Sequence, residues 1–275
     1  MTTRLWLIVN PASGSYSDAA VAELRAAFAG AGAAVERTLM ADRLPDRAAL
    51  EAAGVPLVAA FAGDGTVNAL ATGLEGWAGA LLVLPGGTAN LLARQLHGES
   101  DAAEIAARLP GLARLRRPCI RCSAGTALAE VLAGPGATWS DVREELREPA
   151  VGALAGKAVA ALRQSTAGPM VHLAEPPLGD SAGYSGIRLA VSGGTMEVEG
   201  YGAQTVGDYF RQGLALLRRN FREGPHDELG CHPAILCRSE GGAPMPLMID
   251  GERREGAPEE RFSLAPFALD LLGTR

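Results

Sequence analysis

Within the first hundred residues, a short glycine-containing loop follows a continuous apolar run three times, and a helical pattern follows each loop. The apolar runs are Leu5 to Val9, Pro56 to Phe61 and Ala80 to Leu84. Strands that are apolar throughout are typical of a parallel sheet that is covered on both faces. The sequence therefore predicts an α/β domain whose glycine loops lie at the carboxyl edge of the sheet, where open α/β sheets bind ligands.

Length and composition exclude several classes of protein. The chain has 275 residues, of which 48% are hydrophobic and 20% charged, so it can form a large folded core. Its net charge of −6 argues against a nucleic-acid binder with a broad basic surface. No apolar run reaches the length of a membrane span, so we expect a cytoplasmic protein, with peripheral contact to a membrane left open. The single lysine, Lys157, does not lie in a Walker motif.

The pattern of apolar residues along the sequence changes near residue 118. Short β-like stretches separated by glycine and proline replace the strand–helix alternation, which is typical of an antiparallel β domain. We therefore expect an α/β domain over residues 1–118 and a mostly antiparallel β-sandwich over residues 119–259. Helical insertions are predicted at residues 139–164 and 206–222.

The three loops have the composition of phosphate-binding loops. They are Asn-Pro-Ala-Ser-Gly-Ser at 10–15, Ala-Gly-Asp-Gly-Thr-Val-Asn at 62–68 and Pro-Gly-Gly-Thr-Ala-Asn at 85–90. Small residues let backbone N–H groups surround an anion beside a helix N-terminus. Each loop alone is equally compatible with an ordinary strand-to-helix turn, but three loops at one sheet edge favour a nucleotide site.

A fourth motif, Asp250-Gly251-Glu252, lies far along the chain after a short apolar run. Asp-Gly is a common hairpin turn, and a solvated turn is the simplest interpretation. The alternative is a carboxylate that deprotonates a hydroxyl during phosphoryl transfer.

In this order and at these intervals, the four motifs resemble the diacylglycerol kinase catalytic-domain family, which includes bacterial soluble lipid kinases and is related to sphingosine and ceramide kinases. The resemblance implies a Rossmann-like nucleotide-binding domain, a β-sandwich domain for the lipid substrate, and ATP with Mg²⁺ in the cleft between them. It also implies that residues 260–275 return to the first domain. The implied activity is ATP-dependent phosphorylation of a hydroxyl on a diacylglycerol-like lipid.

Site residues follow from the resemblance, position by position. Asp250 and Glu252 would supply the catalytic base, and Asp64 would belong to the magnesium site. The nucleotide would be bound by Asn10, Ser13, Gly14, Thr38, Ala62, Gly63, Asp64, Gly65, Thr66, Asn68, Gly86 and Thr88.

Several positions depart from the family pattern. Ala62 replaces a glycine, which matters only if that position needs a positive φ. Ser15 and Ala69 replace a basic residue and a glutamate. The segment Ser192 to Met196 lacks the carboxylates of a structural magnesium site found in some members. These departures leave open a catalytically weak nucleotide- or lipid-binding regulator. An NAD kinase ranks lower, because no Asn-Asn-Glu segment follows the second loop.

Two weaker patterns allow further hypotheses. Cys119, Cys122, Cys231, His232 and Cys237 could supply zinc ligands, but free thiols are the main interpretation. Residues 208–222 form an amphipathic, locally basic pattern that suits either a packed helix or a helix at an anionic lipid surface. The expected partner is a lipid substrate at a membrane surface and not a nucleic acid. The oligomeric state stays open, with a homodimer as one alternative.

Overall fold

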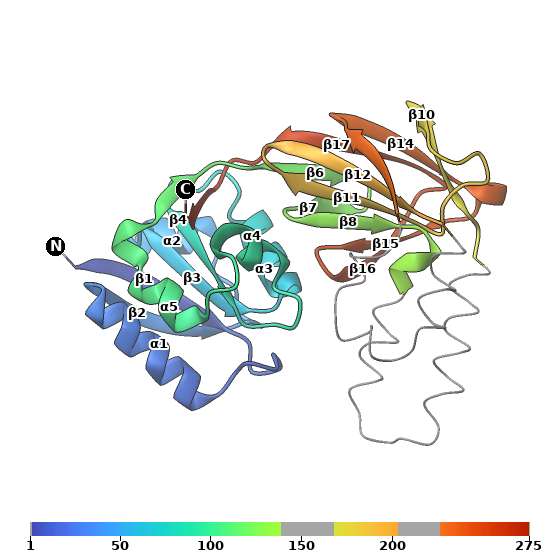
Figure 1. The fold of residues 1–275 in the computed structure, drawn as a ribbon. Coiled ribbons are helices and arrows are strands. Elements are labelled where there is room, and N and C mark those ends of the chain that lie inside the picture. The colour runs from blue at the N-terminus through green and yellow to red at the C-terminus, as the bar shows by residue number, and fades with distance from the viewer. Residues whose placement is uncertain (1, 139–167, 203–225, 275) are drawn as a thin grey trace, which may run out of the picture. The chain divides into compact units, whose positions relative to one another are not determined.

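The computed structural model describes residues 2–138, 168–202 and 226–274 (Figure 1). The helical insertions expected at 139–164 and 206–222, and the amphipathic pattern at 208–222, lie outside these residues. The chain forms two compact units. Unit 1 comprises residues 1–118 with 266–275, and unit 2 comprises residues 119–265. Each unit is described by itself below.

Unit 1 is built on a six-stranded sheet with the strand order β2-β1-β3-β4-β18-β5. Its strands are β1 (Thr3–Val9), β2 (Ala33–Met40), β3 (Leu57–Ala62), β4 (Ala80–Pro85), β5 (Ala113–Leu115) and β18 (Asp270–Gly273). Its helices are α1 (Asp18–Gly30), α2 (Arg47–Ala53), α3 (Asp64–Gly73), α4 (Leu91–His97) and α5 (Ala102–Ala107), with a 3₁₀ turn at Leu109–Gly111.

The sheet is mixed, which corrects the expectation of a purely parallel one. Strands β1 to β4 and β18 are parallel, but β5 runs antiparallel to β18. The first four strands follow the order 2-1-3-4 and not 3-2-1-4, so they match the second common doubly wound arrangement. The Rossmann-like detail of the prediction is therefore not established.

Helices α1 and α5 lie side by side on one face of this sheet (Figure 1). Leu24 and Phe28 of α1 and Ile105 of α5 share a core with alternate residues of β1, β3 and β4. The intervening strand residues, such as Ile8 and Val58, are fully buried as well, as expected for a sheet covered on both faces.

The helix starts explain where the prediction of elements succeeded and failed. The sequence predicts Ser17 as the N-cap of the first helix, and its side chain does accept the Ala20 N–H at the start of α1. The sequence predicts the next helix from Val67 to Leu74, but α3 begins three residues earlier, at Asp64, with Gly63 as its N-cap. Helix α5 was not predicted, although Asp101 and Glu104 form a capping box at its start.

Unit 2 contains two six-stranded sheets. The first has the order β10 (Pro177–Leu178), β9 (Val171–Glu175), β14 (Ala234–Ser239), β17 (Glu259–Pro266), β6 (Pro118–Cys122) and β7 (Gly125–Ala127). The second has the order β13 (Asp227–Cys231), β12 (Thr195–Tyr201), β11 (Gly186–Ser192), β8 (Glu130–Ala133), β15 (Met245–Ile249) and β16 (Glu252–Gly256). Short 3₁₀ turns lie at Pro135–Thr138 and Glu240–Gly242.

Both sheets bury alternate residues in one shared hydrophobic core. Ile235 of β14 and Phe262 of β17 belong to the same buried cluster as Leu189 of β11 and Leu247 of β15. In the first sheet β9 pairs with β10 and β14, β14 with β17, and β6 with β7, all antiparallel, and all neighbouring strands of the second sheet are antiparallel too. Two sheets over one core form a two-layer antiparallel arrangement.

The segment from Ser192 to Thr195 is a tight hairpin turn between β11 and β12. Gly193 and Gly194 both have positive φ, at 53° and 86°, which is the requirement of a type I′ turn. The turn explains these glycines without a metal. Among the described residues, no helix combines the length and the apolar character needed to cross a bilayer.

Candidate active site

Asn10 folds the first glycine loop, which follows β1. Its Oδ1 accepts the Ala12 N–H at 3.0 Å and its carbonyl accepts the Ser13 N–H at 3.0 Å. Asn10 Nδ2 lies 3.3 Å from Thr66 Oγ1 and so joins this loop to the second. Ser13 Oγ is buried with no hydrogen-bond partner among the described residues. Buried hydroxyls are normally paired, so this one is suited to bind a ligand.

The second and third loops are in backbone contact. A Cβ added at Gly86 would lie 2.4 Å from Ala62 N, and one added at Gly87 would lie 2.6 Å from Gly63 Cα. These distances are too short for a Cβ atom. A side chain at either glycine would therefore require the opposite backbone to move. The paired glycines therefore hold the ends of β3 and β4 together at one sheet edge, as the spacing of the loops predicted.

Asp64 joins these two loops through its carboxylate. Asp64 Oδ2 accepts the Asn90 N–H at 2.9 Å and Oδ1 accepts the Leu91 N–H at 2.6 Å. Both donors lie at the start of α4, whose N-terminal N–H groups need acceptors. Asp64 therefore caps a helix that begins 27 residues further along the chain.

Asn90 closes the third loop on itself. It has a left-handed backbone with φ of 52°, and it is the N-cap residue of α4. Its Oδ1 accepts the Gly87 N–H at 2.7 Å and its Nδ2 donates to the Gly87 carbonyl at 3.0 Å. Because its side chain is hydrogen-bonded to Gly87, Asn90 makes no side-chain hydrogen bond to the first turn of α4. The Asp64 carboxylate caps that turn instead.

The remaining predicted nucleotide residues lie in different surroundings. A Cβ at Gly14 would meet nothing within 4 Å, so the fold itself does not require glycine there. Thr38 Oγ1 accepts a hydrogen bond from Arg25 at 2.7 Å, and Thr88 is exposed. The Asn68 carbonyl accepts the Thr72 hydroxyl at 2.8 Å. The half-buried Gly65 lies in the first turn of α3.

Ala62 does not have the positive φ that would make alanine less stable than glycine at this position. Among the described non-glycine residues, only Asn90 and Asp250 have positive φ. Ala62 ends β3 and is buried. The alanine therefore fits this position without backbone strain.

A magnesium ion at the glycine loops would have few ligands from the protein. Within the described part of the chain, no group of three or more His, Cys, Asp or Glu side chains is arranged to bind a metal. Mg²⁺ commonly takes one or two carboxylates and completes its shell with water and substrate phosphates. A single carboxylate beside glycine loops, as at Asp64, fits that use.

Asp250 in unit 2 is buried, at 3% exposure, and is bonded to the backbone. Its Oδ2 accepts the Leu128 N–H at 2.7 Å, and its Oδ1 accepts the Ala129 and Glu130 N–H groups, both at 2.9 Å. Such donors stabilise the carboxylate over the carboxylic acid. The side chain is therefore held in one orientation.

The Asp-Gly hairpin is present as well. Asp250 and Gly251 have φ of 44° and 82°, and Ile249 pairs with Glu252 across the turn, as in a type I′ hairpin. Glu252 is exposed at the start of β16. The motif thus combines a buried carboxylate with an exposed one. It forms the predicted hairpin turn, and this turn is compatible with a chemical role for either carboxylate.

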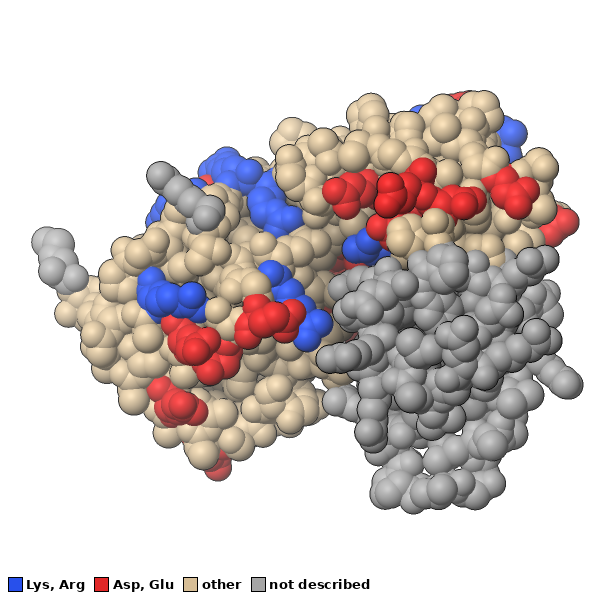
Figure 2. All heavy atoms as spheres, viewed as in Figure 1, with Lys and Arg blue, Asp and Glu red and all other residues tan. Residues whose placement is uncertain are grey.

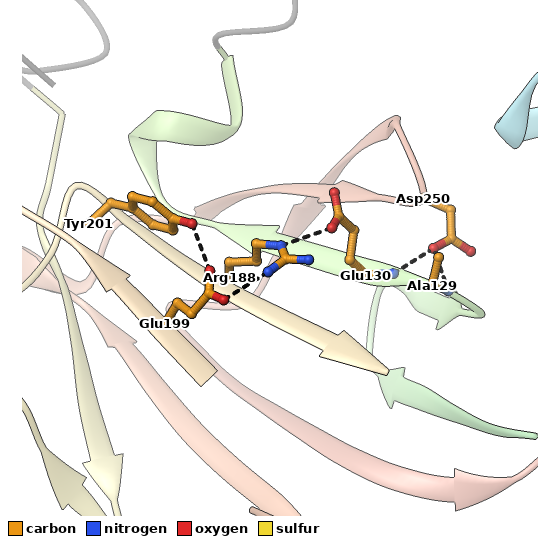
Figure 3. Close-up of polar contacts among 6 residues, drawn as sticks. All are labelled: Ala129, Glu130, Arg188, Glu199, Tyr201 and Asp250. Atoms are coloured by element: carbon orange, nitrogen blue, oxygen red, sulfur yellow. Dashed lines mark hydrogen bonds and ion pairs between the residues drawn. The ribbon is translucent and has the colours of Figure 1, made fainter. Parts of the chain in front are cut away.

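A polar network beside Asp250 was not foreseen from the sequence. It contains Glu130, Arg188, Glu199 and Tyr201, which come from three neighbouring strands (Figure 3). The signal in the sequence was the alternation of polar and apolar residues along β12, with a single charged residue, Arg188, in β11. Their partners depend on strand register, which a single sequence does not reveal.

The cysteines are free thiols. Cys119 and Cys237 are buried, Cys122 is half-buried and Cys231 is exposed. Burial, together with the nearby Glu260 carboxylate, raises the pKa of Cys237 to about 12. In the described part of the chain, no group of three or more possible metal ligands includes these cysteines.

Comparison with known proteins gives the fold and the family. Two crystal structures from Bacillus anthracis strain Sterne, described as a diacylglycerol kinase and a candidate diacylglycerol kinase, match with TM-scores of 0.60 and 0.61. They are 15% and 16% identical, and the match covers 99% of this chain and 97% of each of theirs. These matches show a shared fold. No curated protein matches the sequence.

The family model for the diacylglycerol kinase catalytic domain matches residues 4–116. This range contains all three glycine loops and ends before the Asp250 motif. The family predicted from the four motifs is thereby confirmed. Over residues 4–116, the chain matches the diacylglycerol kinase catalytic domain family.

Proposed function

We propose that this protein is an ATP-dependent lipid kinase that phosphorylates a hydroxyl of a diacylglycerol-like lipid. The observation that carries the proposal is the pair of glycine loops in backbone contact, beside a loop whose Ser13 hydroxyl is buried without a partner. The family of residues 4–116 supports a lipid as the acceptor at a coarse level.

Backbone N–H groups would bind the phosphates of ATP. The first turns of α1 and α2 have side-chain acceptors, Ser17 and Asp46. Helix α3 has none, because its N-cap is Gly63. Its N-terminus therefore suits an anion, with Asn10, Ser13 and Thr66 beside it. Gly14, Gly65, Asn68, Gly86, Thr88 and Thr38 complete the proposed nucleotide site.

Asp64 would hold Mg²⁺ through its carboxylate, and it would keep α4 in place at the same time. When bound, Mg²⁺ neutralises charge on the phosphates. The chain has no Walker lysine, so the proposal assigns phosphate recognition to N–H groups and the metal.

Asp250 would accept the proton of the acceptor hydroxyl. The hydroxyl oxygen forms a bond to the γ-phosphorus, and the bond from that phosphorus to the β–γ bridging oxygen breaks. ADP leaves with the electron pair, and the proton moves to a carboxylate oxygen of Asp250. Glu252 is the alternative acceptor, because it lies two residues away and is exposed. The products are a phosphorylated lipid and ADP.

The test is a phosphorylation assay with the purified full-length chain, ATP labelled at the γ-phosphate, Mg²⁺ and vesicles that contain diacylglycerol. We expect labelled lipid that extracts into the organic phase, and no product when Mg²⁺ is removed. A parallel reaction with a total lipid extract, analysed by mass spectrometry, identifies the acceptor. ATP binding with no labelled lipid from either source would contradict the proposal and favour a binding regulator. Phosphorylation of NAD would instead favour the NAD kinase alternative.

A further inference from the structure

Arg188 lies at the centre of an ion-pair network on the second sheet of unit 2. Its Nε lies 2.9 Å from a carboxylate oxygen of Glu130 on β8, and its Nη1 lies 2.9 Å from one of Glu199 on β12 (Figure 3). The Tyr201 hydroxyl donates to the other Glu199 oxygen at 2.7 Å. Arg188 and Glu199 are directly opposite each other across β11 and β12.

This network is largely withdrawn from water. The side chains of Arg188, Glu130 and Glu199 are only 18–19% exposed. Burial alone would lower the pKa of Arg188, but the two carboxylates outweigh it and raise that pKa. Two carboxylates neutralise one guanidinium, so Arg188 is poorly suited to bind a substrate phosphate. Buried pairs of this kind hold their partners in one geometry.

Glu130 connects the network to Asp250. Its backbone N–H donates to Asp250 Oδ1 at 2.9 Å, and its carbonyl accepts the Asp250 N–H at 3.0 Å. The side chain of the same residue is held by Arg188. Arg188 therefore fixes the end of β8 that supplies the N–H donors to the Asp250 carboxylate.

We propose that Arg188 is a positioning residue: by holding Glu130, it orients the N–H groups of residues 128–130 and thus the Asp250 carboxylate that acts as the base. This inference rests on the proposed function for its kinetic consequence. Its structural part, the order of the donors around Asp250, can be tested without any activity.

The structural test is amide hydrogen exchange in Arg188→Met and wild type. The matched control is Arg238→Met. Arg238 also faces a carboxylate, Glu259, on the adjacent strand of unit 2 at 2.9 Å, but that pair is more than half exposed. In Arg188→Met we expect exchange at Leu128, Ala129 and Glu130 to accelerate about tenfold or more, with no such change in the control. Unchanged exchange at these amides in a folded Arg188→Met protein would overturn the proposal.

The kinetic test compares kcat and KM in the same variants. Arg188→Met should lower kcat about 10- to 100-fold with little change in KM for ATP, since small displacements of a catalytic group have effects of that size. It should also move the acid limb of the kcat–pH profile to higher pH, because weaker N–H donation favours protonation of Asp250. Arg188→Lys should restore part of the rate, because it keeps the charge but not the planar fork.

A double variant separates positioning from general damage. In an Asp250→Asn background, Arg188→Met should have little further effect on kcat. An equal loss in both backgrounds would overturn the proposal, as would a pH profile that stays in place. If Asp250→Asn does not fold, the pH profile and hydrogen exchange decide. A wild-type protein without kinase activity would contradict the proposed function instead, and the exchange experiment would still decide the role of Arg188.

Discussion

Asp64 in unit 1 and Asp250 in unit 2 are both held by backbone N–H groups, but the groups come from different structures. Asp64 accepts two N–H groups from the start of α4. Asp250 accepts three from the segment that leads into β8, about 120 residues earlier in the chain. Asp64 is half-buried, whereas Asp250 is almost fully buried. In both units, an aspartate next to a glycine therefore fixes the backbone of a distant segment by accepting its N–H groups. Any chemical role of the carboxylate would be additional to this structural role.

The two units also differ in what their loops offer a ligand. Unit 1 places glycine backbone and an unpartnered Ser13 hydroxyl at one sheet edge, which suits an anion. Figure 2 shows acidic side chains in a row across the described part of unit 2, whereas arginines and acidic side chains are scattered over unit 1. The proposed phosphate recognition and the proposed proton acceptance therefore depend on different units. The following predictions test that division.

The largest effect is expected at Asp250. Asp250→Asn should lower kcat about 10²- to 10⁴-fold while KM for ATP changes little. The amide would also place an NH₂ group against backbone donors, so a lower melting temperature is expected too. Steady-state kinetics and thermal unfolding measure the two effects. The control is Glu252→Gln, which changes an exposed carboxylate in the same turn. Full turnover in Asp250→Asn, or a greater loss in Glu252→Gln, would rule out Asp250 as the base.

Gly86→Ala should damage unit 1 where the two loops touch. The new methyl would lie 2.4 Å from Ala62 N, and overpacking of this kind costs about 1–3 kcal/mol. We expect a lower free energy of unfolding and weaker ATP binding, measured by denaturant titration and calorimetry. Gly14→Ala is the matched control, since its methyl meets nothing within 4 Å. Equal stability losses in both variants would refute the steric argument.

Asp64→Asn should lose at least one acceptor for the N-terminus of α4. Loss of a helix cap costs about 0.5–2 kcal/mol, and the third loop should lose its fixed position. We expect a higher KM for ATP, lower stability and a higher Mg²⁺ requirement. A variant that needs more Mg²⁺ but unfolds like wild type would show that Asp64 acts on the metal alone.

Acid should weaken unit 1 through His97. Burial, and secondarily the nearby Arg108, lowers the pKa of His97 to about 4. The unfolded chain, with an ordinary pKa near 6.5, therefore binds a proton first. The contribution of neutral, buried His97 to the free energy of unfolding is complete above about pH 6.5. It is lost as the pH falls towards 4. The loss should be about 1–2 kcal/mol by pH 5. Unfolding curves from pH 7 to 5 measure it, and His97→Leu should flatten them. An unchanged slope would exclude His97 as the cause.

Ala62→Gly should have the smallest effect. Restoring the family glycine brings no relief of strain, because Ala62 lacks a positive φ. Glycine in a strand costs about 0.5–1 kcal/mol relative to alanine, so a slightly lower melting temperature with no gain in turnover is expected. A clear increase in kcat would mean that the alanine does limit activity.

Most of what the sequence predicted correctly depends on local signals. Apolar runs predicted β1, β3 and β4, and the Ser17 cap predicted the start of α1, because periodicity and capping act over a few residues. Gly86 and Gly87 were named as loop glycines from their spacing alone. Strands β5 and β18 were missed because they are short and depend on pairing with distant segments. Helix α5 was missed although its capping box is a local signal.

The sequence by itself determined the strand–helix order of the first hundred residues, the three glycine loops and the family of that region. Only the tertiary structure decided what each aspartate binds, why Ala62 is tolerated and that Arg188 lies between Glu130 and Glu199. The physical reason is the range of the interactions. Propensity and steric demand belong to single residues and their neighbours, whereas hydrogen bonds between residues tens to more than a hundred positions apart exist only once strand order and register are set.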